Sequence, residues 1–214
     1  MIVTDIIALN KTKSKIYIDH EFAFVLYKGE ICKNKIRKGE ELPQQVYDLL
    51  TGEILPKRAK MRAMHLLTKQ PYTERKLRQK LEEGLHTEEC INIAIDYVKS
   101  YGYIDDAMYA RDFISYHSGS LSRRQIEMKL LSKGIAQDTI RNVYEQECAG
   151  QQEELEREQI IRLFMKKYHG IVPEDSKERM KMIQFFQRKG YAQNMVNKVI
   201  NTATEDSILD ELYN

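Results

Sequence analysis

The side chains that perform catalysis in other proteins are present in this sequence, but their spacing does not favour an active site. The acidic pairs Asp105-Asp106, Glu82-Glu83 and Glu88-Glu89 are adjacent in sequence, so their side chains diverge on a helix. A hydrolase is one hypothesis, because the run His117–Ser120 places a possible base beside hydroxyl groups. Such His, Ser and Gly residues are, however, ordinary in a loop between two helices. No phosphate-binding glycine loop occurs. The histidines stand singly, without the spacing of metal ligands: His20, His65, His86, His117 and His169. We therefore expect no catalytic residue, no metal and no cofactor.

Basic side chains are the stronger candidates for function. The segment from Pro56 to Tyr103 holds ten basic and six acidic residues, although the net charge of the chain is only +2. A helix with several cations can neutralise phosphates or contact an acidic protein surface, and the sequence does not separate the two. For each residue taken alone, a solvated helix face is the simpler interpretation. The candidate contact residues are Arg58, Lys60, Arg62, Arg75, Lys76, Arg78, Lys80, Arg123, Arg124, Lys129 and Lys133.

These candidates lie in a part of the chain where one apolar pattern recurs three times. Segments that begin at Thr73, Ser122 and Glu178 align by eye. The alignment is anchored on Gly84, Gly134 and Gly190. The next position is apolar in each copy: Leu85, Ile135 and Tyr191. Apolar residues also stand six positions after the glycine, at Cys90, Ile140 and Val196, and nine positions after it, at Ile93, Val143 and Val199. Apolar pairs four apart precede the glycines, with one residue deleted in the first copy: Leu77 and Leu81, Ile126 and Leu130, Met182 and Phe186.

This pattern predicts a helix that ends at a left-handed glycine, followed by a second helix that begins at a polar cap. Thr87 and Ser122 are candidate N-caps. One more amphipathic helix precedes each pair, over residues 57–67, 105–116 and 151–168. Units of this size are small for independent cores, so neighbours should stack into an array that suits an extended partner. We expect an elongated tandem array of three three-helix repeats, over residues 56–103, 104–148 and 149–214, the last with a C-terminal tail.

The first 55 residues differ from the rest, because short β-favouring runs replace the helical periodicity. These runs are Ile2–Leu9, Lys15–Ile18 and Phe22–Tyr27, with a hairpin predicted at Asp19-His20. A short helix should follow from Pro43, a residue suited to the first helical turn. The predicted fold is thus mainly α, with a small β-rich N-terminal domain over residues 1–55.

Composition bounds the setting in which the protein works. Cys32, Cys90 and Cys148 are far apart and form no CxxC pair, which suits a reducing compartment. The N-terminus lacks the basic region of a signal peptide, and no apolar run is long enough for a membrane span. We expect a cytoplasmic monomer without membrane contact.

The junction between the first two repeats is distinctive and resembles the signature of the RecX family. The run from Gly102 to Phe113 joins a turn, an aliphatic residue, an acidic cap and an amphipathic start. Its residues that match the family are Gly102, Tyr103, Ile104, Asp105, Asp106, Tyr109, Ala110 and Phe113, and Gly134 belongs to a second matching stretch. We expect Ile104, Tyr109, Ala110 and Phe113 to be core residues and Asp105 a helix cap. Lys129 departs from the family pattern, which often has an acidic residue there.

The resemblance implies a function without an active site. RecX proteins modulate, and usually inhibit, the RecA recombinase, and their repeat arrays are thought to lie along the groove of the RecA filament on DNA. It therefore implies a RecA filament as partner, with single- or double-stranded DNA contacted weakly or through RecA. The alternative is a stand-alone DNA-binding regulator, because tandem three-helix units with basic second helices resemble helix-turn-helix modules.

Overall fold

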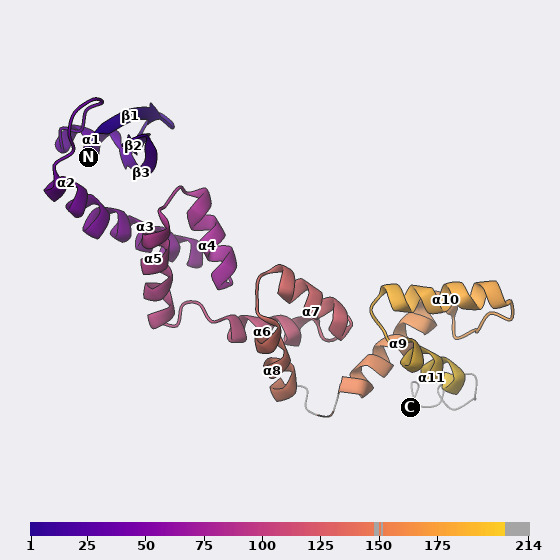
Figure 1. Cartoon of the computed structure of the whole chain (residues 1–214). Helices are drawn as coiled ribbons and strands as arrows, with labels where there is room; N and C mark the ends of the chain where they lie inside the picture. The colour runs from indigo at the N-terminus through magenta and orange to yellow at the C-terminus, as the bar shows by residue number, and fades with distance from the viewer. Residues whose placement is uncertain (148–149, 151, 204–214) are drawn as a thin grey trace. The chain divides into compact units, whose positions relative to one another are not determined.

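The computed structural model describes residues 1–147, 150 and 152–203 (Figure 1). The chain divides into two compact units, Met1–Asp105 and Asp106–Asn214. It is mainly helical, with a small antiparallel sheet before the three-helix repeats, which confirms the predicted fold class. Cys148, Gln151 and the predicted C-terminal tail from residue 204 lie outside the described residues.

The sheet consists of β1 (Val3–Ala8), β2 (Lys13–Ile18) and β3 (Glu21–Tyr27), in the order β1-β2-β3. Asp19 and His20 connect β2 to β3 with φ values of 49° and 73°. Two successive positive φ values are typical of the type I′ turn, whose twist matches that of the flanking strands. The predicted hairpin is therefore present.

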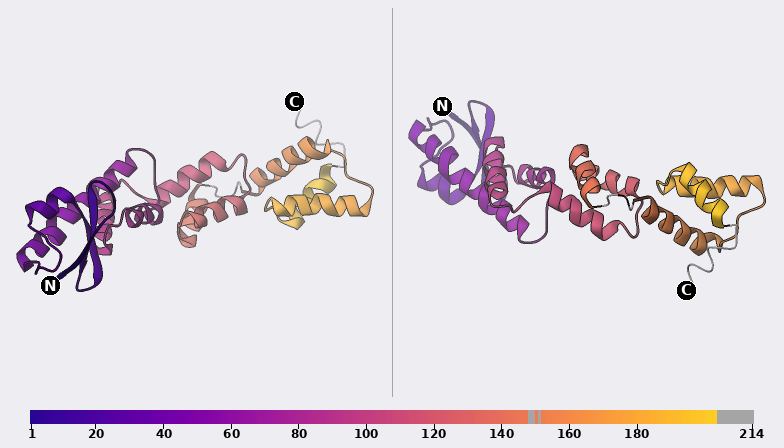
Figure 2. Two further views of the ribbon diagram at one scale, coloured as in Figure 1. Left: turned by 90° about the horizontal axis from the view of Figure 1, so that it is seen from above. Right: turned by 90° about the horizontal axis from the view of Figure 1, so that it is seen from below.

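The first unit continues with helices that share one core with the sheet. They are α1 (Lys28–Lys33), α2 (Gln44–Leu49), the π-helical turn η1 (Leu50–Ile54), α3 (Leu55–Leu67), α4 (Glu74–Glu83) and α5 (Glu88–Ser100). Pro43 is the N-cap residue of α2, one position before its expected place. Both views of Figure 2 show the strands beside the N-terminal helices. Phe24 of β3, Leu50 of η1 and Leu77 of α4 belong to the same buried cluster, so the sheet and the first repeat are packed together.

The second unit holds two three-helix groups, each with its own apolar core. The first is α6 (Asp106–His117), α7 (Arg123–Ser132) and α8 (Gln137–Glu147), and the second is α9 (Gln152–Tyr168), α10 (Ser176–Arg188) and α11 (Gln193–Ala203). Ile126 and Leu130 of α7 are central to one core, and Met182 and Phe186 of α10 to the other. Ser122 caps α7 as predicted, accepting a hydrogen bond from the backbone N–H of Gln125 at 3.3 Å.

The first repeat differs from the predicted alignment by one residue. Gly134 and Gly190 are left-handed, with φ of 92° and 93°, but Gly84 has an ordinary φ of −78°. Leu85 takes the left-handed conformation instead, with φ of 58°. The reversal of the chain that follows is the same in all three repeats, because the N–H of the next residue returns to the helix: His86 to Leu81, Ile135 to Leu130, and Tyr191 to Phe186.

This shift removes the deletion assumed in the first copy and changes which side chains face inward. Leu85 is eight residues past Leu77, as Gly134 is past Ile126. In α5 the residues that correspond to Ile140 and Val143 are therefore Ile91 and Ala94, which are 3% and 0% exposed. Ile93, which the sequence alignment places beside Val143 and Val199, is 40% exposed. Thr87 precedes α5 as expected, but its side chain makes no capping hydrogen bond.

Candidate partner-binding surface

The junction residues lie mainly in packed positions. Ile104 is 7% exposed in the core of the first unit, and Ala110 is fully buried in α6. Tyr109 and Phe113 are half-buried and stack at 6.5 Å on the α6–α8 core. The other residues of the signature lie at a turn, at the surface or at the start of a helix. Gly102 has a left-handed φ of 69°, and Tyr103 is exposed. Asp105 immediately precedes α6, and Asp106 is its first residue.

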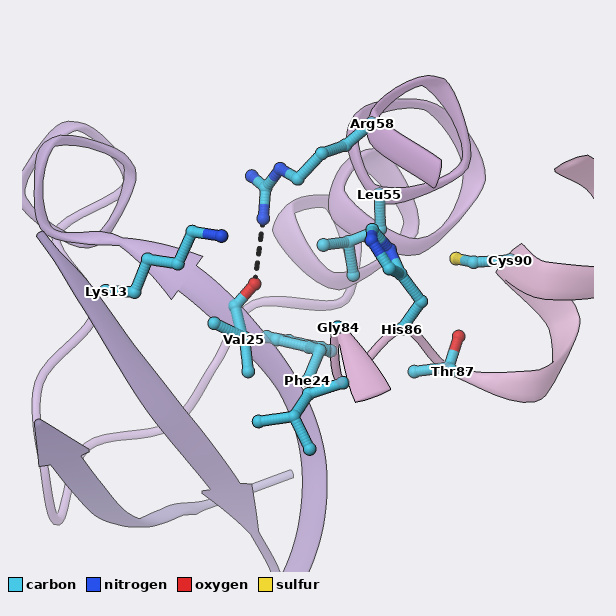
Figure 3. A pocket seen from close by; sticks show the side chains of 10 residues that line it. Lys13, Phe24, Val25, Leu55, Arg58, Gly84, His86, Thr87 and Cys90 are labelled. Atoms are coloured by element: carbon cyan, nitrogen blue, oxygen red, sulfur yellow. Dashed lines mark hydrogen bonds between the residues drawn. The ribbon is translucent and has the colours of Figure 1, made fainter. Parts of the chain in front are cut away.

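Arg58 is held inside the first unit, not presented to a partner. Its guanidinium forms an ion pair with Glu30. It also donates a hydrogen bond to the carbonyl oxygen of Val25 at 2.9 Å, which Figure 3 shows as a dashed line. The same group lies 4.6 Å from the centre of the Tyr27 ring. These contacts join α3 to α1 and β3, so Arg58 fastens the sheet to the first repeat.

Other predicted contact residues also have partners within the fold. Arg78 pairs with Glu74 at 3.0 Å and donates to the amide oxygen of Asn92 at 2.6 Å. Lys80 pairs with Glu83 at 2.6 Å, which raises the pKa of the lysine. Further such contacts are those of Arg123 with Glu127, Gln152 and the Tyr144 ring, of Lys60 with the Tyr97 ring, and of Lys133 near the Tyr109 and Phe113 rings.

Five of the predicted contact residues are exposed and pair with no carboxylate among the residues that the structure describes. They are Arg62 of α3, Arg75 and Lys76 of α4, and Arg124 and Lys129 of α7. Their charged groups therefore stay available to an anionic partner without breaking an ion pair of the fold. The structure thus reduces the candidate set to positions concentrated on the second helix of the first two repeats.

In the corrected register, α4 and α7 carry the same type of basic residue at two positions. Thr73 and Ser122 are the N-caps of α4 and α7, so Arg75 corresponds to Arg124 and Lys80 to Lys129. In α10, counted from Met182, the corresponding residues are Met180 and Phe185. Met180 is 54% exposed, and the ammonium group of Lys167 lies 3.5 Å from the centre of the Phe185 ring. The recurring Arg and Lys are therefore a feature of the first two repeats.

A small basic pocket lies where the first repeat meets the sheet. Lys13, Arg58 and His86 line it together with Thr87 and Cys90 (Figure 3). Burial and the positive charges of Arg58, Lys13 and Arg62 lower the pKa of His86 to about 4. The imidazole is therefore neutral near pH 7 and a poor general acid. The sequence shows His86 only as an isolated histidine, because its half-buried place beside Arg58 and Lys13 depends on residues that are distant in the chain.

Among the residues that the structure describes, no group of three or more His, Cys, Asp or Glu side chains could hold a metal ion. No helix in this described part of the chain is both long and apolar enough to cross a membrane.

Family models match each of the three helical repeats. Residues 59–97 match the first three-helix domain of RecX, residues 105–143 the second, and residues 154–200 the third. Together these matches cover more than half of the chain. The chain belongs to the RecX family. The order of the three models is the order of the repeats, so the array is that of the RecX family.

Individual relatives agree with this assignment. A regulatory protein RecX of Caldanaerobacter subterraneus subsp. tengcongensis is 34% identical over 147 residues, covering 68% of this chain and 75% of the relative. A regulatory protein RecX of Clostridium botulinum is 26% identical over 204 residues, covering 94% of each chain, the N-terminal sheet region included. The chain is thus a member of a family of regulatory proteins.

Two crystal structures share the fold. One, a regulatory protein RecX, has a TM-score of 0.61 and 21% identity, and the match covers 93% of this chain and 98% of the other. The second, RecX from Lactobacillus salivarius, has a TM-score of 0.60 and 17% identity, covering 70% of this chain and 97% of the other. At these identities the likeness concerns the fold alone.

Proposed function

We propose that this protein binds the RecA–DNA filament along its groove and modulates, mostly by inhibition, the recombinase, ATPase and co-protease activities of RecA. Its place is then in DNA repair, homologous recombination and the SOS response. The observation that carries the proposal is the match of all three repeats to the RecX family. The protein would act without catalysis, as a cytoplasmic monomer. The proposal keeps the domain boundaries predicted from the sequence, after residues 55, 103 and 148.

Within this proposal, Arg75 and Arg124 are the first contact residues to test. They are exposed, occupy the same position of α4 and α7, and pair with no carboxylate among the described residues. A cation repeated from one structural unit to the next suits a partner that is itself repetitive and anionic, such as DNA phosphates or acidic side chains along a filament. Arg62, Lys76 and Lys129 are the other exposed candidates.

The experiment adds purified protein to RecA on single-stranded DNA and follows ATP hydrolysis and strand exchange. The unchanged protein should lower both rates, whereas Arg75→Glu/Arg124→Glu should need at least tenfold more protein for the same effect. Arg141→Glu/Arg162→Glu is the matched control, since these exposed arginines lie on α8 and α9 outside the candidate set. No change in RecA activity at stoichiometric levels of the unchanged protein would refute the proposal.

The helix-turn-helix alternative makes a different prediction in the absence of RecA. A stand-alone DNA-binding regulator binds particular sequences tightly, because base contacts add to phosphate contacts. A protein that only assists RecA should bind DNA weakly, equally well at all sequences, and with a steep dependence on salt. Titration of labelled duplexes of unrelated sequence at two salt concentrations separates these two functions.

A further inference from the structure

An acidic groove in the first unit has no role in the proposed contact with an anionic filament. One wall is formed by β3 from Glu21 to Phe24, and the other by η1 and the start of α5. Its lining includes four carboxylates, those of Asp19, Glu21, Glu88 and Glu89, and no Lys, Arg or His side chain. Met1 also lines it, and the N-terminal ammonium group of Met1 lies 3.9 Å from the carboxylate of Glu41. None of the four lining carboxylates pairs with a basic side chain among the described residues. The groove therefore repels nucleic acid and suits a cationic occupant.

The strand that forms one wall is an edge of the sheet. β3 pairs with β2 on one side only, so alternate N–H and C=O groups on its other side have no strand partner. At its C-terminal half this side is occupied, because Arg58 donates to the carbonyl of Val25. From Glu21 to Phe24 it faces the groove, and no hydrogen bond connects the outer backbone there to another described residue.

The groove also offers apolar surface beside this edge. Phe22 is 42% exposed and contacts Tyr17 edge-on, with ring centres 6.0 Å apart. Tyr47 also lines the groove, and its ring centre lies 6.2 Å from that of Phe24. At Ala23 the strand carries a bulge, since Phe24 pairs with Ile16 and Phe22 with Tyr17 while Ala23 has no partner. A bulge often protects an edge strand from unwanted pairing. Here the carboxylates give the edge a charge preference as well.

We propose that this groove binds an extended, basic segment of a partner protein, which pairs with the Glu21–Phe24 edge of β3 as an added strand. Backbone hydrogen bonds to the edge would supply affinity, and side chains that alternate along the added strand would supply specificity. Lysine or arginine side chains of the segment would lie near Glu21, Glu88 and Glu89, and an apolar side chain near Phe22. No residue that lines this groove belongs to α4 or α7, so the proposal does not depend on the proposed function.

The test uses the full chain and a fluorescently labelled synthetic peptide of alternating lysine and valine. Fluorescence anisotropy should show saturable binding, and hydrogen exchange should show new protection at the amides of β3 between Glu21 and Phe24. Glu21→Lys/Glu88→Lys/Glu89→Lys should weaken binding at least tenfold. A matched triple variant, Glu82→Lys/Glu145→Lys/Glu153→Lys, changes the charge by the same amount at exposed positions away from the groove and should change binding less than twofold.

Two further peptides decide between strand addition and simple charge attraction. A peptide with alternate backbone nitrogens methylated keeps its charge but loses the hydrogen bonds of a strand, so it should bind at least fivefold more weakly. A peptide with glutamate in place of lysine should not bind. Equal binding of the methylated peptide, absence of protection at β3, or equal weakening by the two triple variants would each overturn the proposal. Circular dichroism and thermal unfolding of each variant verify that the fold is intact.

Discussion

His86 occupies a position at which the other repeats have an apolar residue. Its equivalents, Ile135 and Tyr191, are 2% and 3% exposed. The histidine is tolerated there because it stays neutral, and burial together with the cations of Arg58, Lys13 and Arg62 lowers its pKa to about 4. We therefore expect this half-buried histidine to make the stability of the first unit sensitive to pH.

The first prediction concerns the pH dependence of stability at His86. An unfolded chain binds a proton at this histidine near pH 6.5, whereas the folded chain resists protonation until about pH 4. Between those values the unfolded state holds more protons, so the stability of the first unit falls as the pH falls. His86→Leu should reduce the drop in unfolding temperature between pH 7.5 and pH 5. His65→Leu, at an exposed site, should leave the drop unchanged. An equal drop in the wild type and His86→Leu would contradict the prediction.

At the scale of single elements, local sequence signals identified strands and helices but not every register. The runs at Lys15–Ile18 and Phe22–Tyr27 became strands because β-favouring residues flank a two-residue turn, and this information is local. The alignment of the first repeat failed because it followed the glycine. Gly84 is only the C-cap of α4, and Leu85 adopts the left-handed conformation although a leucine side chain disfavours it.

The same limit applies to the candidate contact surface. A lysine or arginine on an amphipathic helix looks available in the sequence, yet Arg58 finds Glu30 and Val25, which are 28 and 33 residues away. These partners depend on the packing of the sheet against α3, and the periodicity of apolar residues along a helix does not predict that packing. Pairs within one helix, such as Arg78 with Glu74, could have been predicted from their spacing of four residues. The groove at β3 likewise arises from elements that are distant in sequence.

The second prediction compares the glycines that end α4 and α10. Gly190 has φ of 93°, and a Cβ atom there would lie 2.6 Å from the hydroxyl oxygen of Ser122. Gly190→Ala should therefore lower the free energy of unfolding by at least about 1–2 kcal/mol, the cost of a left-handed alanine, with the clash in addition. Gly84→Ala lacks the left-handed cost because its φ is −78°, and its Cβ would lie 3.1 Å from the Leu81 carbonyl oxygen, so its loss should be smaller. Urea unfolding of both variants is the measurement, and an equal loss in the two would contradict this account of the register.

For the whole molecule, the array can act as a unit only where neighbouring repeats are joined, and the second unit shows such a joint. The Gln159 amide group of α9 donates hydrogen bonds to the carbonyl oxygens of Ser118 and Leu121, which lie between α6 and α7. Its oxygen accepts one from the Tyr191 hydroxyl at 2.9 Å. Ser122, the cap of α7, also donates to the carbonyl oxygen of Lys189 at 2.6 Å. Polar groups thus connect the second repeat to the third.

The third prediction tests whether this joint makes the two repeats unfold together. Gln159 is only 7% exposed, so Gln159→Ala leaves the Tyr191 hydroxyl and two carbonyl groups without their partner, at a cost of about 1–3 kcal/mol. Tyr191→Phe in the same chain removes one of these stranded groups, so the double variant should lose less than the sum of the single losses. Gln184→Ala, exposed on α10, is the control. Hydrogen exchange should show α9 to α11 opening independently of α6 to α8 in Gln159→Ala. Additive losses in the cycle, with both groups of helices still opening together, would mean that apolar packing alone joins the repeats.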